Sequence, residues 1–213
     1  MEHKGIIVEN LYKSFGKEAV LSGVSLSVPP GEIVGVVGNN GSGKTVLMKC
    51  ICGFLRPDSG SVTVNGARVG RDRDFPDSLG IIIETPGFIP GMSGYRNLRT
   101  LAALKGLIGK KEILAVLDRV GLKKSAHKAV AKYSLGMRQR LGIAQAIMED
   151  PAVLILDEPF NGLDKAAVED MRGLLTGLRD RGKAIMLASH NAQDIRELCS
   201  RVHEMDVQKE GTV

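Results

Sequence analysis

Apolar residues along this chain form short continuous runs, and longer stretches with helical spacing lie between them. The runs cover Ile33–Val37, Ile81–Ile83, Val153–Leu156 and Ala184–Ala188. Continuous apolar runs of this length are typical of strands that are buried on both faces of a sheet. Because helical patterns alternate with these runs, we predict an α/β fold with a largely parallel sheet.

The N-terminal part of the chain has a different pattern. Gly5–Asn10, Val20–Val28 and Ser61–Val64 have strand character, and turn sequences such as Asn65-Gly66 bound them. Glycine next to asparagine or proline marks a turn. We predict that these stretches form an antiparallel β-layer beside the main sheet.

Between Gly94 and Glu149 apolar residues recur at helical spacing, and no strand-like run intervenes. The recurring positions are Leu98, Leu101, Leu104, Ile113, Val116, Leu117 and Val120. We therefore predict an inserted helical subdomain. It covers residues 94–143 of a single domain over residues 1–213, whose core and β-layer occupy residues 1–93 and 144–213.

Composition and charge change this picture little. Hydrophobic residues make up 43% of the chain and charged residues 25%, as in ordinary globular proteins. No apolar stretch approaches the roughly 18 residues that cross a bilayer, and the N-terminus lacks the apolar part of a secretory signal. These features predict a cytosolic protein that meets a membrane only through a partner. The net charge of +5 is scattered, so nucleic-acid binding is not expected.

Three cysteines, Cys50, Cys52 and Cys199, lie in apolar stretches with helical character. Helical spacing turns Cys50 and Cys52 about 200° apart, so they are poorly placed to share a metal ion. We expect all three to be buried, reduced thiols.

Residues 38–45 match the phosphate-loop pattern G-x-x-x-x-G-K-[ST], between the strand Ile33–Val37 and the helical run Val46–Phe54. Glycines let backbone N–H groups converge on phosphate oxygens, and the following helix adds its N-terminal N–H groups. Lys44 can reach the β- and γ-phosphates, and the Thr45 hydroxyl can bind Mg²⁺. We predict a site for ATP, with binding residues Asn39, Asn40, Gly41, Ser42, Gly43, Lys44 and Thr45. The alternative, a plain glycine-rich turn, does not explain these flanking elements.

Two adjacent carboxylates follow the buried strand Val153–Leu156. Carboxylates at such a position are costly unless they bind a cation. Asp157 is predicted to hold Mg²⁺ through water. Glu158, expected to point the opposite way along the strand, is predicted to polarise the attacking water. A surface turn after the strand is the alternative.

Four further segments resemble those of ATP-binding-cassette (ABC) ATPases. Tyr133–Arg140 resembles the signature L-S-G-G-Q-x-Q-R, and Asn161–Asp164 resembles the D-loop. His190 resembles the switch histidine, and Phe15 lies where the family places an aromatic ring under the adenine. Their order and spacing cover nearly the whole chain, which is thereby identified as a member of this family.

Each of these residues also has an alternative interpretation. Phe15 can be a core residue, with Tyr12 as the rival partner for the adenine. His190 can be an ordinary histidine at a strand end. Ser134 can be the N-cap of a helix over 135–148, which is compatible with phosphate binding. Asp164 is expected to cap a helix over 165–181 that stops at Gly182.

The resemblance implies a P-loop NTPase (RecA-like) core and a working cycle. Two copies would form a head-to-tail homodimer, with ATP between the phosphate loop of one and Ser134 and Gly136 of the other. His190 would contact the γ-phosphate and help to hold Glu158 and the water. Hydrolysis would open the dimer and move a transmembrane permease, with this chain at the cytoplasmic face of the cell membrane.

The chain departs from the usual family pattern at a few positions. Leu135 and Met137 replace a glycine and a glutamine of the signature, while Ser134 and Gly136 are intact. Glu84 stands where the family usually has the glutamine that senses Mg²⁺ and water. A carboxylate there can accept from metal-bound water as a catalytic and metal-site group, but it adds negative charge near the γ-phosphate.

Glu84 and the residues after it, together with the variant signature, resemble bacterial exporters that handle bacitracin and lantibiotics. Residues 85–95, rich in proline and glycine, are the expected contact with the permease. The alternatives are an importer motor, a soluble ABC ATPase of translation or DNA repair, and a slow nucleotide switch. The chain ends soon after His190, as a minimal form or a truncated one.

Overall fold

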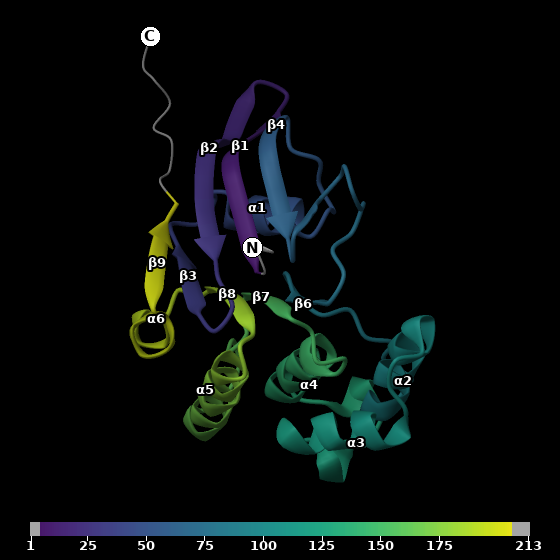
Figure 1. Ribbon diagram of the computed structural model, residues 1–213. Coiled ribbons are helices and arrows are strands. Elements are labelled where there is room, and N and C mark those ends of the chain that lie inside the picture. The colour runs from purple at the N-terminus through teal and green to yellow at the C-terminus, as the bar shows by residue number, and fades with distance from the viewer. Residues whose placement is uncertain (1–4, 206–213) are drawn as a thin grey trace.

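The computed structural model describes residues 5–205, and its centre is a parallel sheet with strand order β6-β7-β8-β3-β9 (Figure 1). The strands are β3 (Ile33–Val37), β6 (Leu79–Ile82), β7 (Val153–Asp157), β8 (Ala184–Ala188) and β9 (Arg201–Glu204). Every pairing within this sheet is parallel. The carboxyl ends of its strands therefore lie at one edge, where ligands bind in open α/β sheets.

A second, antiparallel sheet has the order β2-β1-β4-β5. Its strands are β1 (Ile6–Phe15), β2 (Glu18–Val28), β4 (Ser59–Val64) and the short β5 (Ala67–Arg68). Ile6 lies opposite Val28 on one side and Val64 on the other. This sheet is the β-layer that the N-terminal pattern predicts.

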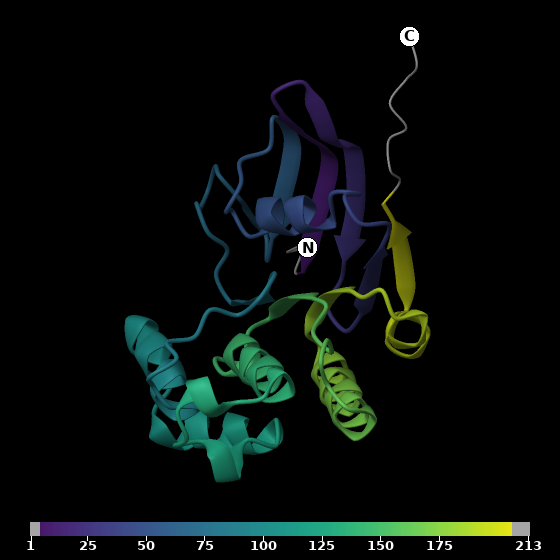
Figure 2. The ribbon, with the colours of Figure 1, turned by 180° about the vertical axis from the view of Figure 1, so that it is seen from behind.

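Helices cover both sides of the parallel sheet (Figures 1 and 2). Helix α1 (Lys44–Ile51) lies on the side of the antiparallel layer, and α4 (Leu135–Ile147) and α5 (Lys165–Asp180) lie on the other side. Helices α2 (Gly94–Lys105) and α3 (Lys110–Arg119) pack beside α4. Helix α6 (Ala192–Leu198) and two 3₁₀ turns, 123–125 and 130–132, complete the described helices.

Neighbouring residues of the central strands face two different cores. Val153 and Ile155 pack with α1 and the antiparallel layer, whereas Leu154 and Leu156 pack with the helices on the other side. All four are fully buried. Strands buried on both faces explain why the sequence shows continuous apolar runs in place of alternation.

Most predicted elements are present, with shifted ends. β3 and β8 have the predicted bounds, whereas β6 begins and ends earlier than the predicted Ile81–Ile83. Strand β1 extends to Phe15, well beyond the predicted end at Asn10. Helix α1 ends at Ile51 and not at Phe54, because Gly53 turns the chain with φ +80°.

Strand β9 and helix α6 are absent from the predicted elements. Among the described strands β9 pairs with β3 alone, and three of its four residues are exposed, so it carries no continuous apolar run. Edge strands of this kind leave little signal in the sequence.

Asp164 caps α5 as predicted, since its carboxylate accepts from the Ala167 N–H over 2.9 Å.

Residues 94–147 contain helices and no strand, as the helical spacing predicts. Helix α4 passes without a break through the predicted boundary at residue 143. It packs against β6 closely, because a Cβ on Gly80 would collide with the backbone carbonyl of Ala146. The helical segment is thus anchored to the central sheet through α4.

Among residues 5–205, no helix combines the length and the apolar character that crossing a membrane requires.

Candidate functional site

The loops that follow β3, β7 and β8 meet at the carboxyl edge of the parallel sheet. Asp157 lies opposite Ala188 in the register of β7 and β8, so Glu158 and His190 emerge side by side. An open cavity of about 330 Å³ lies there, and we call it the phosphate-loop cavity. It is lined by Val20, Asn40, Gly41, Gly43, Lys44, Thr45, Val46, Asp157, Glu158 and His190.

The backbone of the phosphate loop requires glycine. Gly43, the residue before α1, has φ +90°, and a Cβ there would lie 2.9 Å from the Val20 carbonyl oxygen. Helix α1 therefore begins at Lys44 with its N-terminal N–H groups directed at the cavity. Unpaired N–H groups and the positive end of the helix dipole form an anion site, which fits a phosphate chain.

Lys44 is held over the loop by backbone carbonyls. Its Nζ donates to the carbonyl oxygens of Gly38 over 2.7 Å and Asn39 over 2.9 Å. These acceptors are neutral, so the ammonium forms no direct ion pair with a carboxylate. The lysine is therefore ready to bind an anion that enters the cavity.

Thr45 and Asp157 bring two oxygen ligands together. Thr45 Oγ1 donates to Oδ2 of Asp157 over 3.3 Å. Burial raises the pKa of Asp157, and the Thr45 hydroxyl and the Lys44 ammonium oppose that shift. A hydroxyl and a carboxylate beside a phosphate site suit Mg²⁺, which prefers oxygen ligands.

Glu158 enters the same cavity by a turn of the backbone. Strand β7 ends at Asp157, and Glu158 has φ +49°. The expectation that strand alternation points Glu158 the opposite way is therefore wrong, since both carboxylates line the phosphate-loop cavity. Oε1 of Glu158 accepts from the His190 N–H over 2.8 Å, and the imidazole Nε2 lies 3.6 Å from it. Burial raises the pKa of Glu158, against the lowering effect of His190.

Glu84 lies next to this group, outside the residues that line the cavity. Its backbone lies close enough to the carboxyl of Asp157 to lower the pKa of that group. Its side chain forms an ion pair with Lys49 of α1, with Nζ 2.6 Å from Oε1. The negative charge predicted near the phosphate site is thus partly offset by a lysine.

Ser134 and Gly136 line a different cavity, of about 400 Å³, which we call the signature cavity. It also includes Gly162, Leu163 and Asp164. None of the residues that line the phosphate-loop cavity lines it. One copy of the described chain therefore does not bring Ser134 to Lys44.

Ser134 is the N-cap of α4, and its Oγ accepts from the Met137 N–H over 3.2 Å. Leu135, which replaces a signature glycine, is 58% exposed. Its side chain covers Gly162, because a Cβ added to Gly162 would lie 2.5 Å from Cδ2 of Leu135. The substitution thus places an apolar side chain at the mouth of the signature cavity.

Phe15 is 48% exposed, so the alternative that it is a core residue is wrong. Lys13 Nζ lies 5.5 Å from the centre of its ring. Tyr12 is 45% exposed, and its ring packs on Gly23. Neither ring lines the phosphate-loop cavity, where Val20 and Val46 are the apolar lining residues.

Gln139 has a contact that sequence reasoning did not assign. This side chain is buried, and its amide donates to the carbonyl oxygens of Glu158 over 3.1 Å and Pro159 over 3.0 Å. Its place within the signature segment could have indicated that Gln139 belongs to the site. The sequence gives no such indication for Lys49, because its partner Glu84 is distant in the sequence.

Comparison with known proteins identifies related chains. The ABC transporter family model matches residues 21–161. The chain is 43% identical to an uncharacterized ABC transporter ATP-binding protein, YdbJ of Bacillus subtilis, over 92% of this chain and 64% of YdbJ. It is 41% identical to the bacitracin transport ATP-binding protein BcrA of Enterococcus faecalis, over 94% of this chain and 66% of BcrA. The chain thus spans about two thirds of the length of these two relatives.

A lantibiotic transport ATP-binding protein, SrtF of Streptococcus pyogenes, is 36% identical over 90% of this chain and 82% of SrtF. Among solved structures, an ATP-binding subunit of an ABC transporter superposes with a TM-score of 0.87 at 27% identity. That match covers 95% of this chain and 86% of the solved chain. The relatives agree with the resemblance to bacitracin and lantibiotic systems, and the solved structure agrees with the predicted fold.

Proposed function

This chain belongs to the ABC transporter family, and we propose that it is the ATP-hydrolysing subunit of a bacterial exporter of peptide antibiotics. The observation that carries the proposal is the phosphate-loop cavity, which gathers Lys44, Thr45, Asp157, Glu158 and His190. The transport of bacitracin and lantibiotics by its relatives supports the substrate class.

Lys44 and the N-terminus of α1 bind the phosphates of ATP. The ammonium of Lys44 exchanges its carbonyl partners for β- and γ-phosphate oxygens, where a charged acceptor gives a stronger hydrogen bond. Thr45 and Asp157 would hold Mg²⁺, and Glu84 beside them would accept a hydrogen bond from metal-bound water. When bound, Mg²⁺ neutralises the charge that develops on the phosphates. Phe15, whose exposed ring lies outside the lining of the cavity, stacks with the adenine.

Glu158 is the general base in this scheme. Burial raises the pKa of the Glu158 carboxyl toward neutral pH. A general base with such a pKa can be ionised and still accept a proton readily. The His190 N–H fixes one carboxylate oxygen, and the other is left for the attacking water. The exposed imidazole of His190 is available to the γ-phosphate.

Two copies of the chain complete each ATP site. The separation of the signature cavity from the phosphate-loop cavity supports a homodimer in which Ser134 and Gly136 contact the nucleotide of the partner. Residues 94–143 act as the subdomain that carries the signature, anchored through α4. Hydrolysis removes the γ-phosphate contact and opens the dimer.

The loop between β6 and α2 is the proposed contact with the permease at the cytoplasmic face of the membrane. Ile89 is 51% exposed, although its backbone N–H and carbonyl are both bonded to the Asn97 amide, over 2.8 and 3.2 Å. An apolar side chain presented on a fixed backbone suits a protein partner. No nucleic-acid role is proposed.

Two variants of the purified chain test this function. We expect Lys44→Ala to weaken binding of a fluorescent ATP analogue, because the phosphates lose their cation. We expect Glu158→Gln to bind the analogue like the wild type and to lose on the order of 10²–10⁴-fold in hydrolysis. Near-normal hydrolysis by Glu158→Gln would exclude Glu158 as the base.

A further inference from the structure

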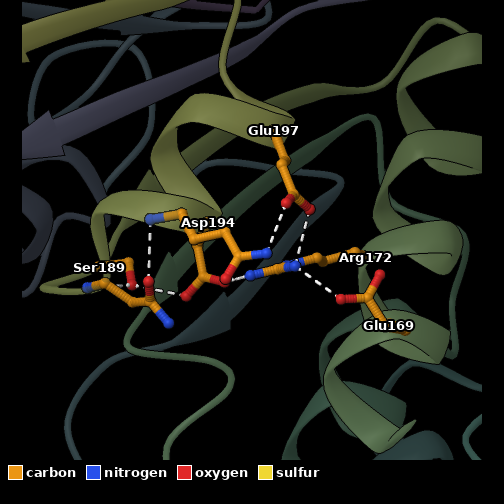
Figure 3. A network of polar contacts seen from close by, with 7 residues as sticks. Glu169, Arg172, Ser189, Asp194 and Glu197 are labelled. Atoms are coloured by element: carbon orange, nitrogen blue, oxygen red, sulfur yellow. Dashed lines mark hydrogen bonds and ion pairs between the residues drawn. The ribbon is translucent and has the colours of Figure 1, made fainter. Parts of the chain in front are cut away.

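A buried ion pair joins α5 to α6, next to Ser189, the residue that precedes His190 (Figure 3). Arg172 of α5 is 5% exposed, and Asp194 of α6 is 2% exposed. The guanidinium donates from Nε and Nη2 to Oδ1 of Asp194, over 3.0 and 2.5 Å. These two charges depend on each other, because an unpaired buried charge is strongly destabilising.

The second carboxylate oxygen of Asp194 holds Ser189, the residue directly before His190. Ser189 Oγ donates to Oδ2 of Asp194 over 2.9 Å and accepts from the Asn191 N–H over 3.1 Å. The hydroxyl therefore bonds across His190, to the residue that follows it. Asp194 ties this short loop to α6, and Arg172 ties α6 to α5 (Figure 3).

The loop held in this way is also the loop that contacts Glu158. The His190 N–H donates to Oε1 of Glu158 over 2.8 Å, and the Glu158 N–H donates to the Ala188 carbonyl over 2.9 Å. Any displacement of the His190 backbone therefore displaces the carboxylate. The path from Arg172 to Glu158 begins with buried hydrogen bonds to Asp194 and from Ser189, continues through one residue of backbone, and ends at the exposed hydrogen bond from the His190 N–H to Glu158.

Folding stability alone is a weaker explanation for this pair. A buried ion pair can often be exchanged for apolar residues of similar volume without loss of stability. What apolar side chains cannot do is orient the Ser189 hydroxyl. Arg172 occupies Oδ1 of Asp194, and this fixes Oδ2 toward Ser189.

We propose that Arg172 and Asp194 are positioning residues for ATP hydrolysis, which act through Ser189 and His190 to hold Glu158 in place. This inference rests on the proposed role of Glu158. Arg172, Ser189 and Asp194 do not line the phosphate-loop cavity, so their loss should affect turnover and spare nucleotide binding.

Ser189→Ala is the mildest test, because it removes the hydroxyl and leaves the ion pair in place. We expect kcat to fall on the order of 10- to 100-fold, as for a misplaced catalytic group, with KM for ATP within about twofold of the wild type. Ser189→Thr keeps the hydroxyl and should retain most of the activity.

A double variant separates positioning from stability. Arg172→Met combined with Asp194→Leu removes both charges, so it should unfold in urea near the wild-type midpoint and still show the low kcat of Ser189→Ala. The controls are Glu169→Gln and Glu197→Gln. These carboxylates accept from the outer Nη1 of Arg172 at 2.7 Å each and are solvent-exposed, so their kcat should be unchanged.

Ser189→Ala combined with Glu158→Gln tests whether Ser189 acts through Glu158. Ser189→Ala should cause no further loss of the slow residual hydrolysis of Glu158→Gln, measured with radiolabelled ATP. A wild-type kcat in Ser189→Ala, or a change in its KM alone, would overturn the positioning role. The same holds if the losses in kcat of Ser189→Ala and Glu158→Gln add up in the double variant. If Glu158→Gln itself keeps wild-type hydrolysis, the proposed function fails instead.

Discussion

Lys49 Nζ lies 2.6 Å from Oε1 of Glu84, which joins the helix after the phosphate loop to the carboxylate after β6. The side chains are 31% and 62% exposed, so the pair adds only about 0–1 kcal/mol to folding stability. We expect its effect to be local, because in the proposed ATP site Lys49 would offset a negative charge that otherwise repels the γ-phosphate.

Lys49→Met should raise KM for ATP several-fold without a large change in thermal stability, since it leaves the Glu84 charge unopposed near the phosphates. In the Glu84→Gln background the same substitution should have no effect on KM. Steady-state hydrolysis by the wild type, both single variants and the double variant measures this coupling. An equal effect of Lys49→Met in both backgrounds would show that the lysine does not act through Glu84.

Glu84→Gln should also change the metal dependence of hydrolysis. An amide oxygen is a weaker acceptor for metal-bound water than a carboxylate, so more Mg²⁺ should be needed for half-maximal activity. A Mg²⁺ titration of the hydrolysis rate checks this expectation. An unchanged titration curve and rate would remove the special role of this carboxylate.

Gln139→Leu should lower both stability and turnover. The buried amide is a partner of the Glu158 and Pro159 carbonyls, and its loss removes the donor from the buried Pro159 acceptor, which costs about 1–3 kcal/mol. The turn that carries Glu158 loosens, so kcat falls more than nucleotide affinity. Gln145→Leu, on the same helix, is the matched control. Equal kcat values in the two variants would contradict a role for Gln139 in holding that turn.

The three thiols should be unreactive in the folded protein. Burial raises the pKa of Cys50 from 9.0 to about 11, and those of Cys52 and Cys199 to about 12. Because the thiolate is the reactive form, iodoacetamide at pH 8 should label the folded chain slowly and the urea-unfolded chain at all three sites. Fast labelling of Cys50 or Cys52 in the folded chain would contradict their burial.

The same shifts set the sign of a pH effect on stability. Between pH 9 and about 11 the unfolded chain loses thiol protons that the folded chain keeps. The folded state then binds more protons, so the free energy of unfolding falls as the pH rises through this window. Urea titrations of the wild type and of Cys50→Ala should show a shallower decline in the variant.

The sequence predicted those parts of the molecule that local pattern determines. β3 and β8 are short apolar runs with clear boundaries, and their predicted ends are those of the structure. The caps at Ser134 and Asp164 depend on residues a few positions apart; the cap at Asp164 was predicted, and the cap at Ser134 was the alternative interpretation of that residue. Local chemistry was sufficient in each case.

Contacts between distant segments were not predictable in this way. The position of Glu158 depends on a left-handed turn after β7, on the Gln139 amide and on the His190 loop. The pairs Lys49–Glu84 and Arg172–Asp194 each join two elements whose proximity follows only from the assembled fold. Spacing in the sequence carries no signal for such contacts.

In the proposed homodimer, Ser134 of one copy completes the ATP site of another. The light-scattering mass of Glu158→Gln, with and without ATP, alone and combined with Ser134→Arg, tests this arrangement. We expect Glu158→Gln to double in mass with ATP. The combined variant should bind the fluorescent ATP analogue equally well and remain a monomer. A monomer in the first case, or an ATP-dependent dimer in the second, would contradict the shared site.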